Sequence, residues 1–342
     1  MTGIVLILLL NTGMMACKKS SDTTTTLPPS DTIPFAKGAD VGWITEMEAA
    51  GVRFYNSSGS QQEGMALLKS LGMNTIRLRA WVNPSPSWNN TNDVVAKAVR
   101  AKNLGMRVMI DFHYSDTWAD PGSQTKPAAW SSLDFTSLKT NLGSYTKNVL
   151  TQLKQAGVTP EWVQVGNETN DGMLWPDGRA STNMAQFAQL IDAGYAAVKA
   201  IFPESKVIVH VSNGYDNGLF RWLFDGLKAN NARFDVIGMS LYPSYFASGW
   251  QNANAQCLQN MNDMVSRYNK PVMIVEVGMP WDQASTCEAF ISDLISKVKS
   301  VPDRKGLGVL YWEPLAYANW KGYTLGAFDN TGKPTVALNA FQ

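Results

Sequence analysis

The sequence has few histidines and cysteines, and its charges nearly cancel. Two histidines and three cysteines occur in 342 residues, and neither Cys257 nor Cys287 lies in a CxxC motif. A Cys/His zinc site is therefore not supported. The formal net charge is +1, which gives no electrostatic basis for binding nucleic acid or an acidic polymer. We expect a neutral substrate, no nucleic acid partner, and no metal or cofactor.

The chain also lacks a long apolar run at its amino terminus. The run from Ile4 to Leu10 is far too short to span a bilayer. Ala16 directly before Cys17 resembles the cleavage box of bacterial lipoproteins, and a Ser/Thr/Asp/Pro-rich stretch follows up to Pro34. Such a stretch buries too little apolar surface to fold. We expect a lipoprotein-type signal peptide over residues 1–16, a flexible tether over 17–34 and a catalytic domain over 35–342.

This organisation predicts a secreted protein held at the bacterial outer membrane or cell surface by a lipid on Cys17. The alternatives are a soluble secreted protein and an incidental cysteine. Cys257 and Cys287 would then form an even pair in an oxidising compartment. A disulfide and two free buried thiols both remain open.

Short β-branched runs alternate with amphipathic helical patterns from Phe35 onward. The expected strands are 36–41, 75–79, 107–113, 162–168, 206–212, 236–242, 271–277 and 308–313. The expected helices are 63–71, 93–104, 138–155, 184–201, 219–229, 255–267 and 287–298. Eight such units predict an α/β fold of one domain, a (β/α)8 TIM barrel. A doubly wound open sheet is the alternative, but no Gly-rich turn follows the first strand.

Polar residues stand at the carboxyl ends of these strands, where barrel enzymes carry their chemistry. Glu168 ends the fourth strand and Glu276 ends the seventh, each after an apolar run. Cleavage of a glycosidic bond needs two carboxyl groups, one to protonate the leaving oxygen and one to attack or to position water. The alternative is that each glutamate forms a structural ion pair with an arginine.

Five segments of the chain, in order on successive strands, resemble family 53 endo-β-1,4-galactanases, within the large clan of retaining (β/α)8 glycosidases. They are residues 37–40 (KGAD), 74–83 (NTIRLRAWVN), 111–122 (DFHYSDTWADPG), 164–168 (QVGNE) and 308–314 (GVLYWEP). The resemblance runs from about Phe35 to Phe341, and the third segment is the most specific. It implies a monomeric enzyme that cleaves β-1,4-galactan or type I arabinogalactan internally with retention.

The same resemblance assigns roles to individual residues. Glu168 would be the acid/base and Glu276 the nucleophile, with Asn167 on the sugar 2-hydroxyl. Arg79 would lie beside the nucleophile and Tyr242 would donate to it, while Trp312 would form the floor under the sugar. Further substrate contacts are expected from Asp40, His113, His210, Trp118 and Trp281. Asp40 and the two histidines could instead support other residues, and the tryptophans could pack in the core.

Other readings remain open on the sequence alone. Another member of the same clan, such as a β-mannanase or β-glucanase, is disfavoured by the third segment. A non-catalytic glycan-binding lipoprotein would not need both glutamates. A metal-dependent hydrolase would need more than two histidines. Some bacterial members of the family carry calcium in the loops after the seventh and eighth strands, but the short stretch 312–333 offers few carboxylate ligands.

Overall fold

Eight parallel strands close into a barrel in the computed structural model, which describes residues 34–342 together with Met1 and Gly3. The strands are β1 (Ala36–Asp40), β4 (Thr75–Ala80), β5 (Arg107–Phe112), β6 (Trp162–Val165), β7 (Lys206–Val211), β8 (Val236–Leu241), β9 (Val272–Val277) and β10 (Gly306–Tyr311). They follow chain order around the barrel, and β1 closes it by pairing with both β10 and β4. The expected signal peptide and the tether up to residue 33 lie outside the described residues, apart from Met1 and Gly3.

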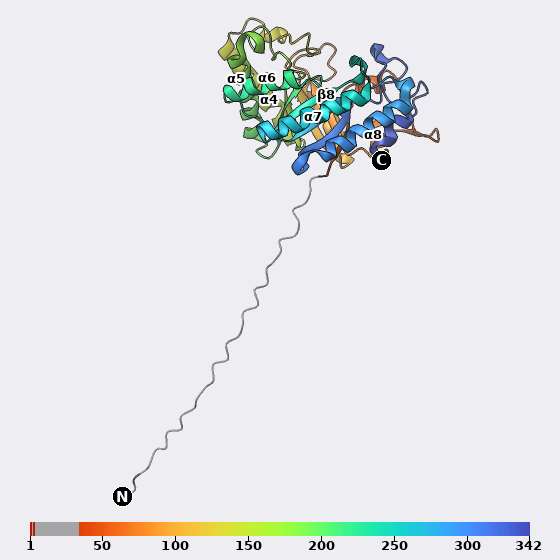
Figure 1. Cartoon of the computed structure of the whole chain (residues 1–342), viewed down its shortest axis with the longest axis horizontal. Coiled ribbons are helices and arrows are strands. Elements are labelled where there is room, and N and C mark those ends of the chain that lie inside the picture. The colour runs from red at the N-terminus through yellow and green to blue at the C-terminus, as the bar shows by residue number, and fades with distance from the viewer. Residues whose placement is uncertain (2, 4–33) are drawn as a thin grey trace. The chain divides into compact units, whose positions relative to one another are not determined.

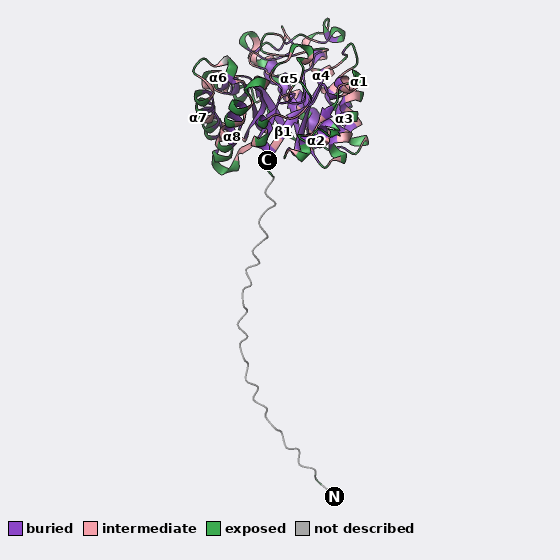
Figure 2. Cartoon of the chain, turned by 90° about the vertical axis from the view of Figure 1, so that its right-hand side faces the viewer, coloured by how far each residue is buried: buried purple, intermediate pink, exposed green. Residues whose placement is uncertain are grey.

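Helices follow the barrel strands and cover the outside of the barrel (Figure 1). They are α1 (Ile44–Ala49), α2 (Gly64–Ser70), α3 (Thr91–Asn103), α4 (Phe135–Gln155), α5 (Ala180–Ile201), α6 (Asn217–Ala229), α7 (Trp250–Tyr268) and α8 (Ala284–Ser300). Short 3-10 helices occur at η1 (Ala128–Trp130), η2 (Pro243–Tyr245), η3 (Trp281–Gln283), η4 (Pro302–Arg304), η5 (Trp320–Gly322) and η6 (Val336–Phe341). Figure 2 shows the buried strands enclosed by helices whose outer faces are exposed.

The prediction of a single-domain (β/α)8 barrel is confirmed, with differences at the edges of its elements. Helices α3 and α4 begin a few residues before their apolar patterns because Asn90 and Asp134 cap them through their side chains. Helix α1 and the hairpin of β2 (Phe54–Tyr55) with β3 (Gln61–Gln62) were not predicted from the sequence. Helix α1 has six residues and the hairpin strands two each, which is too short for a periodic pattern.

The barrel has two separate apolar clusters. The larger one lies between the strands and the helices. The smaller one takes alternate positions of the strands and fills the barrel interior: Ala36, Met109, Trp162, Ile208, Val236, Met273, Val275 and Leu310. Further along the same strands the inward positions become polar, beginning with Arg77, Asp111, Gln164 and His210. The apolar layer therefore forms a floor, and polar side chains occupy the carboxyl end of the barrel.

The two cysteines in the described part of the chain do not form a disulfide. Cys257 and Cys287 are both buried free thiols, and this settles the alternative in favour of two separate thiols. Among the described residues, no helix combines the length and apolar character needed to cross a bilayer.

Candidate active site

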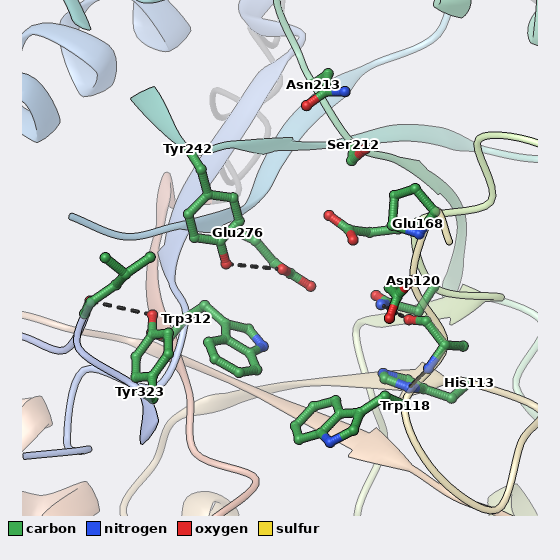
Figure 3. A pocket seen from close by; sticks show the side chains of 14 residues that line it. His113, Trp118, Asp120, Glu168, Ser212, Asn213, Tyr242, Glu276, Trp312 and Tyr323 are labelled. Atoms are coloured by element: carbon green, nitrogen blue, oxygen red, sulfur yellow. Dashed lines mark hydrogen bonds between the residues drawn. The ribbon is translucent and has the colours of Figure 1, made fainter. Parts of the chain in front are cut away.

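A cavity of about 410 Å³ opens at the carboxyl ends of the strands, above the polar layer (Figure 3). Its lining is His113, Trp118, Ala119, Asp120, Pro121, Asn167, Glu168, Ser212, Asn213, Tyr242, Glu276, Trp312, Tyr323 and Leu325. Seven residues named from the sequence for direct roles therefore meet here: His113, Trp118, Asn167, Glu168, Tyr242, Glu276 and Trp312. Glu168 and Glu276 extend toward one another from opposite sides of the cavity.

Glu168 stands in an unusual turn directly after β6. The strand ends at Val165, Gly166 has φ +84°, and Glu168 itself has φ +43°. A side chain at Gly166 would meet Thr169 at 2.6 Å, so the turn requires glycine there. A non-glycine residue in the left-handed region costs free energy and persists only when its surroundings hold it. The turn directs Glu168 into the cavity instead of continuing the strand.

Glu276 faces the cavity because β9 contains a bulge. Met239 of β8 pairs with Ile274, but the next residue, Ser240, pairs with Glu276, so Val275 is an extra residue on β9. Ile274 belongs to the outer apolar cluster and Val275 to the inner one. Strict alternation would turn Glu276 outward like Ile274, and the extra residue reverses this.

Glu276 accepts hydrogen bonds from two donors in the cavity wall. Arg77 Nη1 lies 2.7 Å from its Oε1, and the Tyr242 hydroxyl lies 3.1 Å from its Oε2. The side chain of Glu276 is almost fully buried. An ion pair and a hydroxyl donor therefore both favour its charged form.

The guanidinium of Arg77 connects residues from four other strands or strand ends. Its Nη1 also donates to Asp40 Oδ2 at 2.6 Å, and its Nη2 donates to Gln164 Oε1 at 2.9 Å and to Asn167 Oδ1 at 3.0 Å. Asp111 Oδ2 lies 3.0 Å from Nη2. Arg77 is fully buried, so its charge is compensated entirely by these side chains.

Burial raises the pKa of both glutamates to about 7. For Glu276, the nearby charge of Arg77 opposes this rise, while the charge of Glu168 adds to it. For Glu168, hydrogen bonding to Ser240 lowers the pKa, and the charges of Asp120 and Asp111 raise it. Two coupled carboxyls in this range share a proton near neutral pH. We place that proton on Glu168, because only Glu276 has a direct ion pair.

Aromatic side chains form one wall of the cavity. Trp118 and Trp312 both line it, with ring centroids 5.8 Å apart, and Trp43 packs edge-on against each of them at 5.8 and 5.1 Å. Tyr323 packs edge-on against Trp312 at 4.8 Å. Half-buried aromatic faces beside two carboxyl groups suit the apolar face of a sugar ring.

The prediction that Arg79 lies beside Glu276 is wrong, because Arg77 occupies that place. Arg79 is fully buried and its Nη1 forms an ion pair with Glu313. Its guanidinium lies 4.6 Å from the ring centroid of Trp118 and 5.2 Å from that of Trp43. The two arginines share a face of β4 two residues apart, and alternation alone does not say which one reaches β9.

Three other residues expected to contact substrate lie outside the cavity lining. Asp40 and His210 are fully buried behind the wall, because each is on a strand at a level below the cavity and bonds to other side chains. Trp281 begins η3 and is half-buried. His113 does line the cavity, and its Nε2 lies 3.1 Å from Asp111 Oδ2.

Four polar or aromatic lining residues were not predicted from the sequence: Asp120, Ser212, Asn213 and Tyr323. Asp120 lies inside the most specific of the five segments, and Ser212 and Asn213 directly follow β7, so position after a strand was an available signal. Tyr323 comes from the long segment after β10, for which no pattern predicts a direction. Within residues 34–342, no group of three or more His, Cys, Asp or Glu side chains could hold a metal ion.

Replacing Glu168 by Gln should stabilise the fold at alkaline pH and much less in acid. The native pKa of about 7 lies above the ordinary glutamate value of 4.5, so the folded protein keeps this proton at pH values where the unfolded chain has lost it. The stability that this proton provides is present below pH 4.5 and is lost as the pH rises through 7. We expect a gain on the order of 2 kcal/mol at pH 8, measured by denaturant unfolding. A gain at pH 4 as large as at pH 8 would contradict this origin, and Glu204→Gln, at an exposed position, is the control.

Known glycoside hydrolases resemble this chain along the whole barrel. Residues 36–341 match the sequence family described as glycosyl hydrolase family 53. An arabinogalactan endo-β-1,4-galactanase of Thermothelomyces thermophilus is 34% identical over 90% of this chain and 98% of its own, and one of Humicola insolens is equally similar over the same shares. A structure from a study of two fungal β-1,4-galactanases superposes with a TM-score of 0.82 at 32% identity, covering 90% of this chain and 98% of the other. The chain belongs to glycosyl hydrolase family 53.

Proposed function

We propose that this protein is an endo-acting, retaining glycoside hydrolase that cleaves β-1,4-galactosidic bonds in galactan and type I arabinogalactan. The observation that carries the proposal is the pair of glutamates facing one another across an aromatic-walled cavity. Relatives named as arabinogalactan endo-β-1,4-galactanases, at about a third identity over nearly the whole barrel, support the choice of substrate. One chain supplies the whole cavity, so a monomer suffices.

In the first step Glu276 attacks the anomeric carbon while Glu168 gives its proton to the departing glycosidic oxygen. The Glu276–C1 bond forms as the C1–O bond breaks, and a glycosyl-enzyme results. Arg77 and Tyr242 hold Glu276 charged and fix the direction of its oxygens. Burial keeps the proton on Glu168, whose pKa of about 7 makes it an effective acid near neutral pH.

In the second step Glu168, now a carboxylate, takes a proton from water, which attacks the same carbon. The Glu276–C1 bond breaks, and the product keeps the configuration of the substrate because two inversions have occurred. Loss of the charge on Glu168 after each cycle restores the starting state. Trp312 and Trp118 would carry the sugar rings during both steps.

The two glutamates should respond differently to removal. Glu276→Ala should abolish galactan hydrolysis, and azide should partly restore turnover because it takes the place of the missing nucleophile. Glu168→Ala should slow galactan hydrolysis by roughly 10²–10⁴-fold, and less for aryl glycosides whose leaving groups need no proton. Rates with and without azide on both substrates measure this. Equal losses on galactan and on the aryl glycoside for Glu168→Ala would refute its role as the acid.

Product analysis on unsubstituted β-1,4-galactan tests the substrate and the stereochemistry together. We expect short oligosaccharides at the first time points, with the β-anomer visible by proton NMR before mutarotation. Mannan, β-glucan and β-1,3-galactan serve as comparison substrates. Galactose alone from the start would exclude endo cleavage, cleavage of mannan without galactan would move the activity to another substrate, and initial α-anomer would exclude retention.

We also propose that the enzyme is secreted and anchored to the cell surface or outer membrane by a lipid on Cys17. The support is the apolar run from Ile4 to Leu10, the Ala16–Cys17 pair and the polar stretch that follows. Cys17→Ala should move the enzyme from the membrane fraction to the soluble fraction with kcat unchanged. Cys257→Ala is the control for loss of a cysteine, and membrane association that survives Cys17→Ala would contradict the anchor.

A further inference from the structure

His210 lies directly behind Glu168 but does not line the cavity. It is fully buried on β7, and its Nδ1 accepts a hydrogen bond from the backbone N–H of Glu168 at 3.3 Å. Its Nε2 lies 2.7 Å from the hydroxyl of Ser240, which is fully buried on β8. Ser240 also acts on the Glu168 carboxyl as a hydrogen-bond partner that lowers its pKa. His210 thus touches both the backbone and, through one hydroxyl, the side chain of Glu168.

The surroundings of His210 determine which ring nitrogen carries the proton. The backbone N–H of Glu168 points at Nδ1 and cannot change its polarity, so Nδ1 acts as an acceptor. Nδ1 has two further neighbours: Gln164 Nε2, an amide donor, lies 3.0 Å away, and Asn167 Oδ1 also lies 3.0 Å away. That oxygen has other donors within hydrogen-bond distance, Arg77 Nη2 at 3.0 Å and Gln164 Nε2 at 3.1 Å, so it does not need a proton from Nδ1. Burial also lowers the pKa of His210 well below its usual value, so the ring is neutral with its proton on Nε2.

The tautomer fixes the direction of the Ser240 hydroxyl. If Nε2–H donates to Ser240 Oγ, the hydroxyl hydrogen is free to point only at another acceptor, and the Glu168 carboxyl is its partner. The His210 Nε2–H therefore donates to Ser240 Oγ, and the Ser240 O–H donates to the carboxyl of Glu168. This chain of two donors ends at the residue proposed to transfer the proton. Bonds arranged this way polarise one another and strengthen.

We propose that His210 and Ser240 are positioning residues that direct one neutral hydrogen-bond donor at Glu168 and so set how readily it gives up its proton. The proposal rests on the acid/base role proposed above for Glu168. That role requires a neutral carboxyl in the first step and a carboxylate in the second. A neutral donor favours the carboxylate modestly and offsets part of the effect of burial, whereas a direct cation would leave Glu168 ionised at rest.

Other charged groups also shift the pKa of Glu168, so the test must separate their effect from the effect of the Ser240 hydroxyl. The charge of Arg77 from β4 lowers its pKa, while the charges of Asp111 at the end of β5 and of Asp120 in the following loop raise it. Glu276 from β9 and Tyr242 after β8 interact with it as well. All of these groups stay in place when Ser240 is replaced by alanine.

The first test reads the tautomer in the unaltered protein. The chain has only two histidines, so ¹⁵N-imidazole labelling followed by two-bond ¹H–¹⁵N NMR gives two sets of signals, and the His210→Gln spectrum assigns them. We expect His210 to be neutral with its proton on Nε2 between pH 5 and 8. A proton on Nδ1, or a charged ring in this range, would overturn the proposal. His113, whose Nδ1 accepts from Trp81 Nε1 and Ala119 N–H, provides an internal reference for the same tautomer.

The second test measures the pKa of Glu168 without substrate, by ¹³C-carboxyl NMR in the Glu276→Gln background. Removal of the donor by Ser240→Ala should raise this pKa by roughly 0.5 to 1 unit. The control is Ser205→Ala, which removes an equally buried hydroxyl that donates to Pro160 before β6. Adding His210→Gln to Ser240→Ala should raise the pKa no further, because the Ser240 hydroxyl is the route by which His210 acts on the Glu168 carboxyl, and its other bond is to the Glu168 backbone. An unchanged or lowered pKa in Ser240→Ala, or an equal rise in Ser205→Ala, would refute the proposal.

The same variants distinguish failure of this proposal from failure of the proposed function. In Ser240→Ala the rate of galactan hydrolysis should fall at a higher pH than in the unaltered enzyme, by the pKa shift that NMR gives. With an aryl glycoside whose leaving group needs no proton, the alkaline limb of the rate profile should be unchanged. If galactan is not hydrolysed by the unaltered enzyme, the function is wrong while both NMR results still stand. If galactan is hydrolysed and the limb does not move, the positioning role is wrong.

Discussion

The ion pairs of Arg77 determine how the carboxyl end of the barrel is built. A fully buried guanidinium is tolerated only when anions and acceptors satisfy its donors, and here Asp40, Asp111, Gln164 and Glu276 do so. These residues come from β1, β5, β6 and β9, so one side chain fixes the relative positions of strands on opposite sides of the barrel. Asn167, next to Glu168, also bonds to Arg77.

This arrangement holds more negative than positive charge, and protonation restores the balance. Three carboxyl groups surround Arg77. Burial raises the pKa of Asp40 to about 8 and that of Glu276 to about 7, and the charge of Glu276 adds to the rise at Asp40 while that of Glu168 adds to the rise at Glu276. The protein therefore binds protons here that the unfolded chain would release near neutral pH. Carboxyl groups held near their point of ionisation are what an acid/base mechanism at neutral pH needs. The apolar layer below this region supplies stability that the polar layer does not.

The sequence contains enough information to place the strands and the two glutamates, because β-branched runs and polar strand ends are local patterns. The direction of Glu276 is different. Its inward orientation depends on the extra residue Val275 in β9, and the run 272–277 contains nothing that distinguishes a bulge from a regular strand. The left-handed turn at Glu168 likewise depends on Gly166, where a side chain would collide with Thr169 and Met173, and that crowding is set by tertiary packing.

The choice between Arg77 and Arg79 was not available from the sequence for a similar reason. Both face inward, and only the stagger of the neighbouring strands decides that Arg77 meets Glu276 while Arg79 meets Glu313. Strand stagger is a property of the closed barrel. The position of His210 could not be predicted from the sequence either. A histidine at a strand end was expected to contact substrate, but it lies behind Glu168.

The central claim is that Arg77 and Tyr242 maintain Glu276 as the nucleophile that forms a covalent bond to the sugar. Incubation with a 2-deoxy-2-fluoro β-galactobioside carrying an activated leaving group slows the second step and lets the glycosyl-enzyme accumulate. Mass spectrometry of the intact protein and of its peptides then locates the adduct. The account predicts one sugar per chain, attached at Glu276. An adduct on Glu168 or Asp40, or turnover of the reagent without any adduct, would contradict it.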